Sequence, residues 1–161
     1  MQEIQLSKKH IKYVLLLGAL LLGVLVIDVF ADKDARDAAK TAEESVVELF
    51  SIDFKRDIAA QLPPCTETGR EFWTLHLGTI QDTAKANGAA VQSIKAERNG
   101  SPEPYSGIGG EGQIVPVTLT IAVQDKDGRI ETSESEIQIL MIKGQDGEWL
   151  LDGLAVDTPS G

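Results

Sequence analysis

Val115-Pro-Val-Thr-Leu-Thr-Ile-Ala-Val123 alternates large apolar side chains with smaller or polar ones along its whole length. Successive side chains of a strand point to opposite faces of a sheet, so this alternation predicts a β-strand with one face in a core. Asp125-Lys-Asp-Gly128 follows and predicts a tight hairpin turn. These four residues resemble the start of a calcium-binding loop, but Arg129 and Ile130 do not complete the ligand spacing, so we expect a turn without a metal.

The residues after this turn predict two further strands. The first carries apolar residues on both faces at its far end, Ile137, Ile139 and Met141 on one face and Leu140 and Ile142 on the other. We therefore expect that end of the strand to be covered on both sides. A turn at residues 144–147 precedes the last strand, which we expect over residues 148–156.

Upstream of the central strand, glycine and proline interrupt the pattern. Residues 91–98 predict a modest strand, and residues 101–112 predict an irregular, flexible loop. Gly107-Ile-Gly-Gly-Glu-Gly112 matches the G-x-G-x-x-G motif of dinucleotide-binding proteins. That motif has to follow a strand and open a helix. Here a proline-rich loop precedes it and a strand follows it, so we expect no cofactor there.

The residues before the strands predict two amphipathic helices. The first is expected over residues 32–62, where Pro63-Pro64 ends it, with alanines that favour helix but add little burial. Its apolar stripe is expected to comprise Val47, Phe50, Phe54 and Ile58. The second is expected to begin at Thr68, which can form a capping box with Glu71, and to end at Asn87-Gly88. Its buried stripe is expected to comprise Trp73, Leu77, Ile80 and Ala84, flanked by Phe72 and His76. Helices followed by three or four antiparallel strands predict an α+β domain, with the helices packed on a curved sheet.

The N-terminal region contains an unbroken apolar run, YVLLLGALLLGVLVI, from Tyr13 to Ile27. Extended to Ala31, it approaches the ~20 residues that a membrane-spanning helix needs. Lysines precede the run and aspartates follow it, so the positive-inside rule places the N-terminus in the cytoplasm and the remainder across the membrane. The residues expected to anchor this helix in the bilayer are Tyr13, Leu16, Leu20, Val24 and Ile27.

A cleaved signal peptide is the alternative interpretation, because Val29-Phe-Ala31 offers residues that a signal peptidase accepts. The apolar run lies at or beyond the upper end of the ~7–15 residues usual in such peptides, and Asp28 falls within the would-be cleavage region. We therefore favour a retained anchor. The expected organisation is a cytoplasmic tail (1–12), a transmembrane helix (13–31), a periplasmic α+β domain (32–156) and a flexible tail (157–161).

The chain is acidic, with a formal net charge of −10, and the exported part alone carries about −11. Phosphate backbones would repel such a domain, so we expect no nucleic-acid partner. Cys65 is the single cysteine and cannot form a disulfide within its own chain. Intermolecular pairing, lipidation and a buried inert thiol stay open for it, and the last is favoured.

The sequence offers no convincing catalytic constellation, so we expect no catalytic residue, cofactor or metal. His76 is more typical of a packing histidine beside Trp73 than of a base or a zinc ligand, and nothing identifiable would orient it toward Cys65 for nucleophilic chemistry. If the domain instead encloses a pocket between sheet and helices, Asp53, Asp57 and His76 are the ionisable side chains expected to face it.

Asp146-Gly-Glu-Trp149, followed by apolar residues and preceded by helices, resembles the end of the cystatin-like α+β fold of the nuclear-transport-factor-2-like superfamily. With a basic N-terminus and one span, the layout is similar to bitopic inner-membrane components of type IV secretion and conjugation machines, of the VirB and DotI/IcmL types. The other segments that carry the likeness are residues 54–62, Thr66-Glu-Thr-Gly69 leading to Phe72-Trp73, and the strand from Trp149 to Val156. The resemblance implies a periplasmic domain that self-associates and contacts other subunits, with no catalytic residues to transfer.

We therefore expect a single-pass protein of the bacterial inner membrane that is a non-catalytic structural or assembly subunit of an envelope-spanning complex. Its expected partners are the lipid bilayer, other membrane or periplasmic subunits, and further copies of itself. The alternative is a membrane-anchored small-ligand-binding domain or enzyme that uses a pocket between sheet and helices.

Overall fold

The structure is a computed structural model that describes residues 33–53 and 55–155, with only the backbone described at 83–85 and 87. The predicted cytoplasmic tail, the transmembrane helix with its anchor residues and the C-terminal tail (157–161) lie outside the described residues. Neither helix of the described part has the length and apolar character that crossing a membrane requires.

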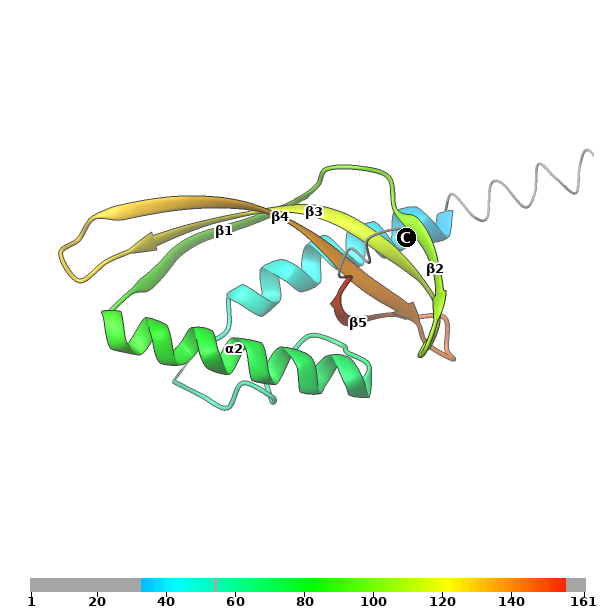
Figure 1. Cartoon of the computed structure of the whole chain (residues 1–161), viewed down its shortest axis with the longest axis horizontal. Helices are drawn as coiled ribbons and strands as arrows, with labels where there is room; N and C mark the ends of the chain where they lie inside the picture. Colours follow the sequence, from blue (N-terminus) through cyan, green and yellow to red (C-terminus); the bar gives the residue numbers. More distant parts are fainter. Residues whose placement is uncertain (1–32, 54, 156–161) are drawn as a thin grey trace, which may run out of the picture. The chain divides into compact units, whose positions relative to one another are not determined.

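The described residues form an α+β domain in which two helices pack on a five-stranded antiparallel sheet, so the predicted fold class is confirmed. Figure 1 shows both helices on the concave side of the curved sheet. The sheet has more strands than the three or four expected. In chain order the elements are a helix over residues 33–50, α2 (Glu67–Asn87), β1 (Ala90–Arg98), β2 (Glu103–Gly107), β3 (Gly110–Gln124), β4 (Ile130–Lys143) and β5 (Trp149–Leu154).

The long β3–β4 hairpin is the centre of the sheet, whose strand order is β1-β3-β4-β5, with β2 on β3 beyond the end of β1. β1 pairs with residues 117–124 of β3, whereas β5 pairs with residues 139–143 of β4. We call residues 110–117 of β3 with 137–143 of β4 the proximal half of the hairpin. Residues 118–124 with 130–136 are the distal half, which ends in the predicted turn at Asp125–Gly128.

The core lies mainly under the proximal half and extends to Leu119 of the distal half. Side chains that are fully buried there include Val46 and Leu49 of the first helix, Leu77 of α2, and Val115, Val117, Ile139, Met141 and Leu151 of the sheet. The far end of β4 is covered on both faces, as predicted, because Leu140 and Ile142 are also buried.

The first helix ends at Phe50, twelve residues before the predicted end at Leu62. Local hydrogen bonds replace the helical ones. The Asp53 carboxylate accepts the N–H of Lys55 at 3.0 Å, and the side-chain amide of Gln61 donates to the carbonyls of Asp53 and Asp57 at 3.1 and 2.9 Å. Such side-chain contacts to the backbone compete with helix propagation.

The buried face of the first helix also differs from the predicted stripe. Ala38, Ala39 and Ala42 are 0%, 3% and 0% exposed, whereas Val47 and Phe50 are only half-buried. The expectation that these alanines add little burial was wrong, because small side chains allow a helix to pack closely on its neighbours. Ile58 is buried as predicted but lies outside the helix, and Phe54 lies outside the described residues.

The N-cap of α2 is Thr66, not the predicted Thr68. The Thr66 hydroxyl oxygen accepts the N–H of Gly69 at 2.9 Å, and the hydroxyl donates to Asp152 of β5. A threonine at this position satisfies one of the free N–H groups at a helix start. The predicted end is confirmed, because Gly88 follows the helix with a φ of 61°.

The predicted stripe of α2 is right at Trp73 and Leu77, which are 4% and 0% exposed. It is wrong at Ile80, which is 41% exposed, and the side chain of Ala84 lies outside the described part.

Residues 101–112, predicted to be an irregular loop, form β2 and the start of β3 around a turn at Ile108-Gly109. Gly109 and Gly110 adopt φ values of 112° and 123°, which residues with a side chain rarely adopt. A Cβ at Gly112 would lie 2.2 Å from the carbonyl oxygen of Met141. The glycines of the G-x-G-x-x-G match therefore serve a hairpin and a close strand contact.

Candidate functional site: an apolar groove under the distal half

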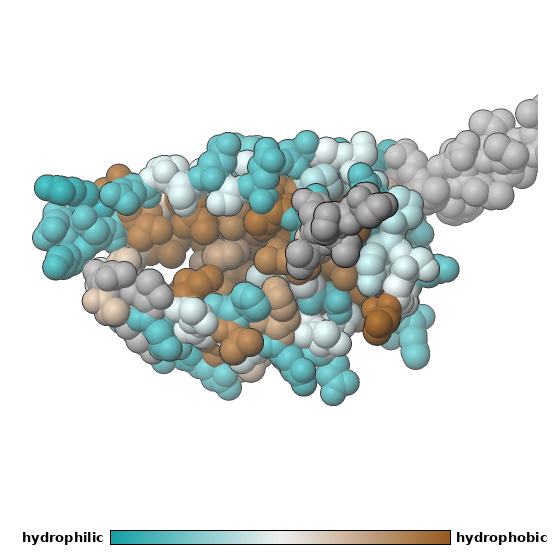
Figure 2. All heavy atoms as spheres, in the orientation of Figure 1, coloured by the Kyte–Doolittle hydropathy of each residue, from teal (hydrophilic) through white to brown (hydrophobic). Residues whose placement is uncertain are grey.

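A groove with a volume of about 660 Å³ lies between the distal half of the sheet, the end of the first helix and α2. Its apolar lining residues are Phe50, Ile52, Ile80, Ala89, Ala90, Val91, Ile94, Ile121 and Val123. Figure 2 shows hydrophobic side chains lining a hollow between the sheet and α2. Ile80 and Val91 remain 41% and 42% exposed, so the domain leaves apolar surface open to solvent here.

The groove exists because the first helix is short. The helix covers the proximal half and ends at Phe50, which is itself a lining residue. A helix continuing to Leu62, as the sequence predicted, would have added further turns beyond this point. The side-chain hydrogen bonds of Asp53, Asp57 and Gln61 that end the helix therefore help to leave the distal half uncovered.

Strand register makes the floor of the groove continuous. Val91 pairs with Val123 and Ile94 with Ile121, so these side chains lie on the same face of β1 and β3. A register shift between Val91 and Ser93 separates the two pairs. The result is an apolar strip two strands wide.

The floor becomes polar at β4, and the groove is narrowed at the hairpin tip. Glu131 and Ser133 of β4 are the partners of Val123 and Ile121 and share their face. At the tip, a Cβ placed on Gly88 would lie 3.5 Å from the Cβ of Lys126, so the end of α2 meets the hairpin turn.

Asp53 and Lys55 are the ionisable residues of the lining. The Asp53 carboxylate is already engaged, by the N–H of Lys55 at 3.0 Å and by the Arg56 guanidinium at 3.4 Å. Within residues 33–53 and 55–155, the ammonium group of Lys55 forms no ion pair. The lining therefore combines a carboxylate that already has partners with a lysine that has no ion pair in this part of the chain.

The structure brings one of the three predicted pocket residues to the groove, namely Asp53. Asp57 is exposed and its carboxylate accepts the N–H of Ala59 at 3.0 Å. His76 is exposed, and its ring stacks on Phe72 with centroids 3.9 Å apart. Sequence reasoning missed Lys55, because the helix was expected to continue past it to Leu62.

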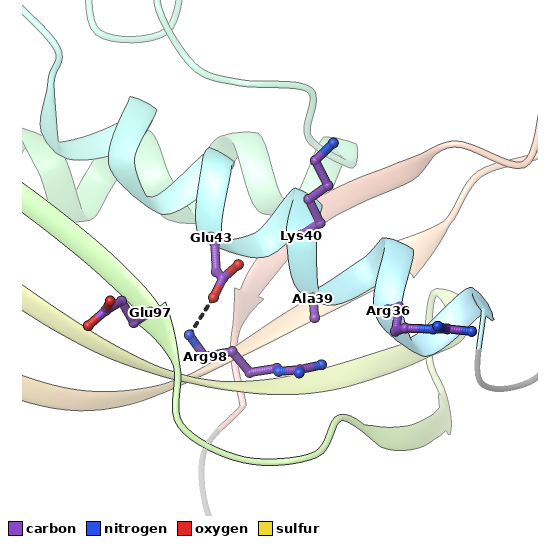
Figure 3. A pocket seen from close by; sticks show the side chains of 6 residues that line it. All are labelled: Arg36, Ala39, Lys40, Glu43, Glu97 and Arg98. Carbon is purple, nitrogen blue, oxygen red and sulfur yellow. Dashed lines mark hydrogen bonds between the residues drawn. The ribbon is translucent and has the colours of Figure 1, made fainter.

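A second hollow, of about 610 Å³, lies where the first helix crosses β1. Its lining combines both signs of charge, from Arg36, Lys40, Glu43, Glu97 and Arg98. In Figure 3 the Glu43 carboxylate points at β1, where it accepts the backbone N–H of Arg98, while Lys40 points away. Glu97 pairs with Lys95 at 2.8 Å. These contacts join the helix to the strand and do not gather charge of one sign.

Cys65 is half-buried, and its thiol donates to the carbonyl of Pro63 at 2.9 Å. Burial raises the pKa of this thiol above its ordinary value of 9.0, and the nearby Arg70 only partly opposes the effect. The thiol is therefore protonated at neutral pH, which favours the interpretation as an inert group.

No protein-family model matches this chain, and no curated protein matches it. In the part of the chain that the structure describes, no three His, Cys, Asp or Glu side chains are grouped to hold a metal ion. The function therefore has to be argued from the groove itself.

Proposed function

We propose that this chain is a membrane-anchored, non-catalytic binding protein whose periplasmic domain holds a small apolar ligand in the groove. The observation that carries the proposal is the groove volume of about 660 Å³, combined with an apolar floor. Small-ligand sites are concave, mostly apolar and about 300–1,000 Å³ in volume, with few polar groups. From the sequence alone, ligand binding is the alternative to a role as an assembly subunit, and the geometry of the groove favours ligand binding.

Binding rather than reaction is favoured by the state of the groove's ionisable groups. The Asp53 carboxylate is held by Arg56 and by a backbone N–H, so its oxygens are not arranged to take a proton from a ligand. A general base has to reach its proton at about 2.6–3.2 Å. His76, the other predicted base, stacks on Phe72 instead of lining the groove.

The binding test uses the full-length chain in nanodiscs of phosphatidylcholine, with Cys65→Ser and Val91→Cys introduced together. Val91 lines the groove and is 42% exposed, so a cysteine there reacts with maleimide when the groove is empty. We expect octanol to slow this reaction. Ile108→Cys is the matched control, because Ile108 is 98% exposed and does not line the groove. Equal rates with and without octanol at Val91→Cys would contradict the proposal.

The proposed setting is the bacterial inner membrane, with residues 13–31 as the single span and the N-terminus in the cytoplasm. The apolar run after a basic start supports this topology. Ile108→Cys in a Cys65→Ser background is a better probe than Cys65, which is half-buried. A membrane-impermeant maleimide should label it in intact spheroplasts, and labelling only after lysis would contradict the topology.

A second candidate is an assembly subunit of an envelope-spanning complex, related to the type IV secretion and conjugation components with nuclear-transport-factor-2-like domains. The observation that favours it is the edge of β4. Residues 130–137 pair with β3 on one side, and on the other side no strand of the described part pairs with them. An unpaired edge can accept a strand from another chain.

The assembly candidate predicts self-association and contact with other envelope proteins. Gentle detergent extraction of the full-length chain, followed by native mass measurement, should then recover a large assembly. A clean monomer without co-purifying proteins would contradict this candidate and would leave the ligand-binding proposal standing.

A further inference from the structure

We infer that the ligand of the groove is an amphiphile, with an aliphatic chain on the β1–β3 floor and an anionic head, a carboxylate or a phosphate, at Lys55. The inference rests on the proposed function and specifies the ligand class of the same site. A contrast within the lining carries the inference. The lining contains an apolar strip, and it also contains Lys55 together with Asp53, whose carboxylate is already engaged by Arg56.

The floor suits an unbranched chain better than a polar molecule. Val91, Val123, Ile94 and Ile121 form the apolar strip, and Gln92 and Ser93 also line the groove at the register shift between the two pairs. Phe50 and Ile80 add apolar walls. Burying aliphatic carbon on such surfaces is favourable in proportion to the apolar area removed from water. The groove therefore gains most from a ligand that lies along the strip.

The wall formed by Asp53 and Lys55 favours a ligand whose head group carries a negative charge. Arg56 and the N–H of Lys55 both contact Asp53, so this carboxylate is compensated within the protein. Lys55 is one of the lining residues, and its ammonium group forms no ion pair in residues 33–53 and 55–155. An anionic head beside it makes a charge-assisted hydrogen bond, which is about twice as strong as a neutral one.

The overall acidity of the chain does not prevent this contact. A net charge of −10 acts at long range, where physiological salt screens charges beyond about 8 Å. The head group in the groove interacts with Lys55 at contact distance. The acidity slows the approach of an anion, whereas Lys55 determines how long it stays.

The test compares ligands that share one chain and differ in the head. In the Cys65→Ser, Val91→Cys chain in phosphatidylcholine nanodiscs, octanoate, octyl phosphate, octanol and octyltrimethylammonium are titrated against the maleimide reaction. We expect both anions to protect the cysteine at about tenfold lower concentration than octanol, since a hydrogen bond to a charged group strengthens binding beyond that of the shared chain. The cation should protect least. Preference for one anion over the other distinguishes a fatty acid from a phosphate-bearing lipid.

Lys55→Gln separates the head-group inference from the proposed function. We expect this variant to keep the protection by octanol and to lose the tenfold advantage of the anions. Lys40→Gln is the matched control, because Lys40 is also an exposed lysine but lies on the first helix outside the groove. Unchanged anion preference in Lys55→Gln, or equal protection by octanol and octanoate in the parent, would overturn the inference and leave the apolar site intact. Protection by none of the four compounds would overturn the proposed function itself.

Discussion

Along β3, the proximal and distal halves of the β3–β4 hairpin have the same alternation of side chains but different surroundings. In the proximal half, Val115, Val117 and Ile139 are completely buried under the two helices. In the distal half, Ile121 and Val123 lie on the same face of the same strand and are only half-buried, along the groove. The difference teaches that alternation specifies which face of a strand is apolar, whereas the length of the helix beneath decides whether that face is covered.

The two halves therefore have different roles. Burial in the proximal half stabilises the fold, because apolar area removed from water contributes roughly 25 cal/mol per Å². The distal half forgoes part of that stabilisation and keeps an apolar surface that a ligand can cover. Substitutions in the two halves should accordingly affect different measurements.

The largest effect is expected in the proximal half. Ile139→Ala should lower the free energy of unfolding by about 2–5 kcal/mol, since Ile139 is 0% exposed and its loss leaves a cavity. Ile121→Ala is the distal counterpart and should cost clearly less, because its side chain already borders open space. Urea unfolding of both variants checks this difference. Equal losses would show that the two halves are packed alike.

A smaller effect is expected where α2 meets β5. A Cβ at Gly69 would lie 2.4 Å from the carbonyl oxygen of Leu151, so Gly69→Ala should cost about 1–3 kcal/mol through backbone displacement. Gly78 lies in the same helix with no atom within 4 Å of such a Cβ. Gly78→Ala should stabilise the protein by up to ~1 kcal/mol. Thermal unfolding measures both, and a loss in Gly78→Ala as large as in Gly69→Ala would contradict the close contact.

The helix cap offers a still smaller test of the proximal half. Thr66→Ala removes the N-cap and the contact with Asp152, and should cost about 1 kcal/mol. Thr68→Ala is the control, because Thr68 is exposed within the first turn and should change the stability little. If urea unfolding showed a larger loss of stability for Thr68→Ala than for Thr66→Ala, the N-cap would be Thr68, as the sequence predicted.

Cys65 provides a test that depends on pH. Its folded-state pKa is raised above 9.0 by burial, and alkylation requires the thiolate. In the folded protein the alkylation rate should therefore keep rising with pH beyond 9.0, whereas in urea it should level off near that value. The stability should also depend on pH. The folded state keeps the thiol proton of Cys65 to a higher pH than the unfolded state does, so the free energy of unfolding should fall as the pH rises from about 9 through the raised pKa. A folded-state rate that levelled off below pH 9 would contradict the burial of the thiol.

The smallest stability effect is expected at the groove. Ile80 is 41% exposed, so Ile80→Asn should change the free energy of unfolding by less than about 1 kcal/mol. The same substitution removes an apolar wall and should weaken the protection of Val91→Cys by octanol. Leu75→Asn, at an exposed leucine of α2 outside the groove, is the control and should leave that protection unchanged.

The fold could be predicted from the sequence where local pattern and tertiary contacts agree. The strand at Val115–Val123, the hairpin turn and the end of α2 at Gly88 were of this kind, because each depends on nearby residues. The N-cap was not, since the local capping-box pattern favours Thr68, whereas Asp152, far along the chain, contacts Thr66.

The site was harder to predict than the fold, for a related reason. Asp53 was expected to face a pocket and lines the groove. Lys55, Ile94 and Ile121 were not identified, because their role depends on an uncovered surface. That surface follows from the early end of the first helix, and the hydrogen bonds of Gln61 that stabilise this end join residues up to eight positions apart. Hydrophobic periodicity does not contain such contacts.

The most direct test of the account compares two cysteines on opposite faces of β1. Val91 faces the groove, whereas Lys95 pairs with Thr120 on the other face of the sheet. In the Cys65→Ser full-length chain in nanodiscs, octanol should slow the maleimide reaction of Val91→Cys several-fold and leave that of Lys95→Cys unchanged. Equal slowing of both, or of neither, would contradict the claim that the distal half of the sheet is a binding surface.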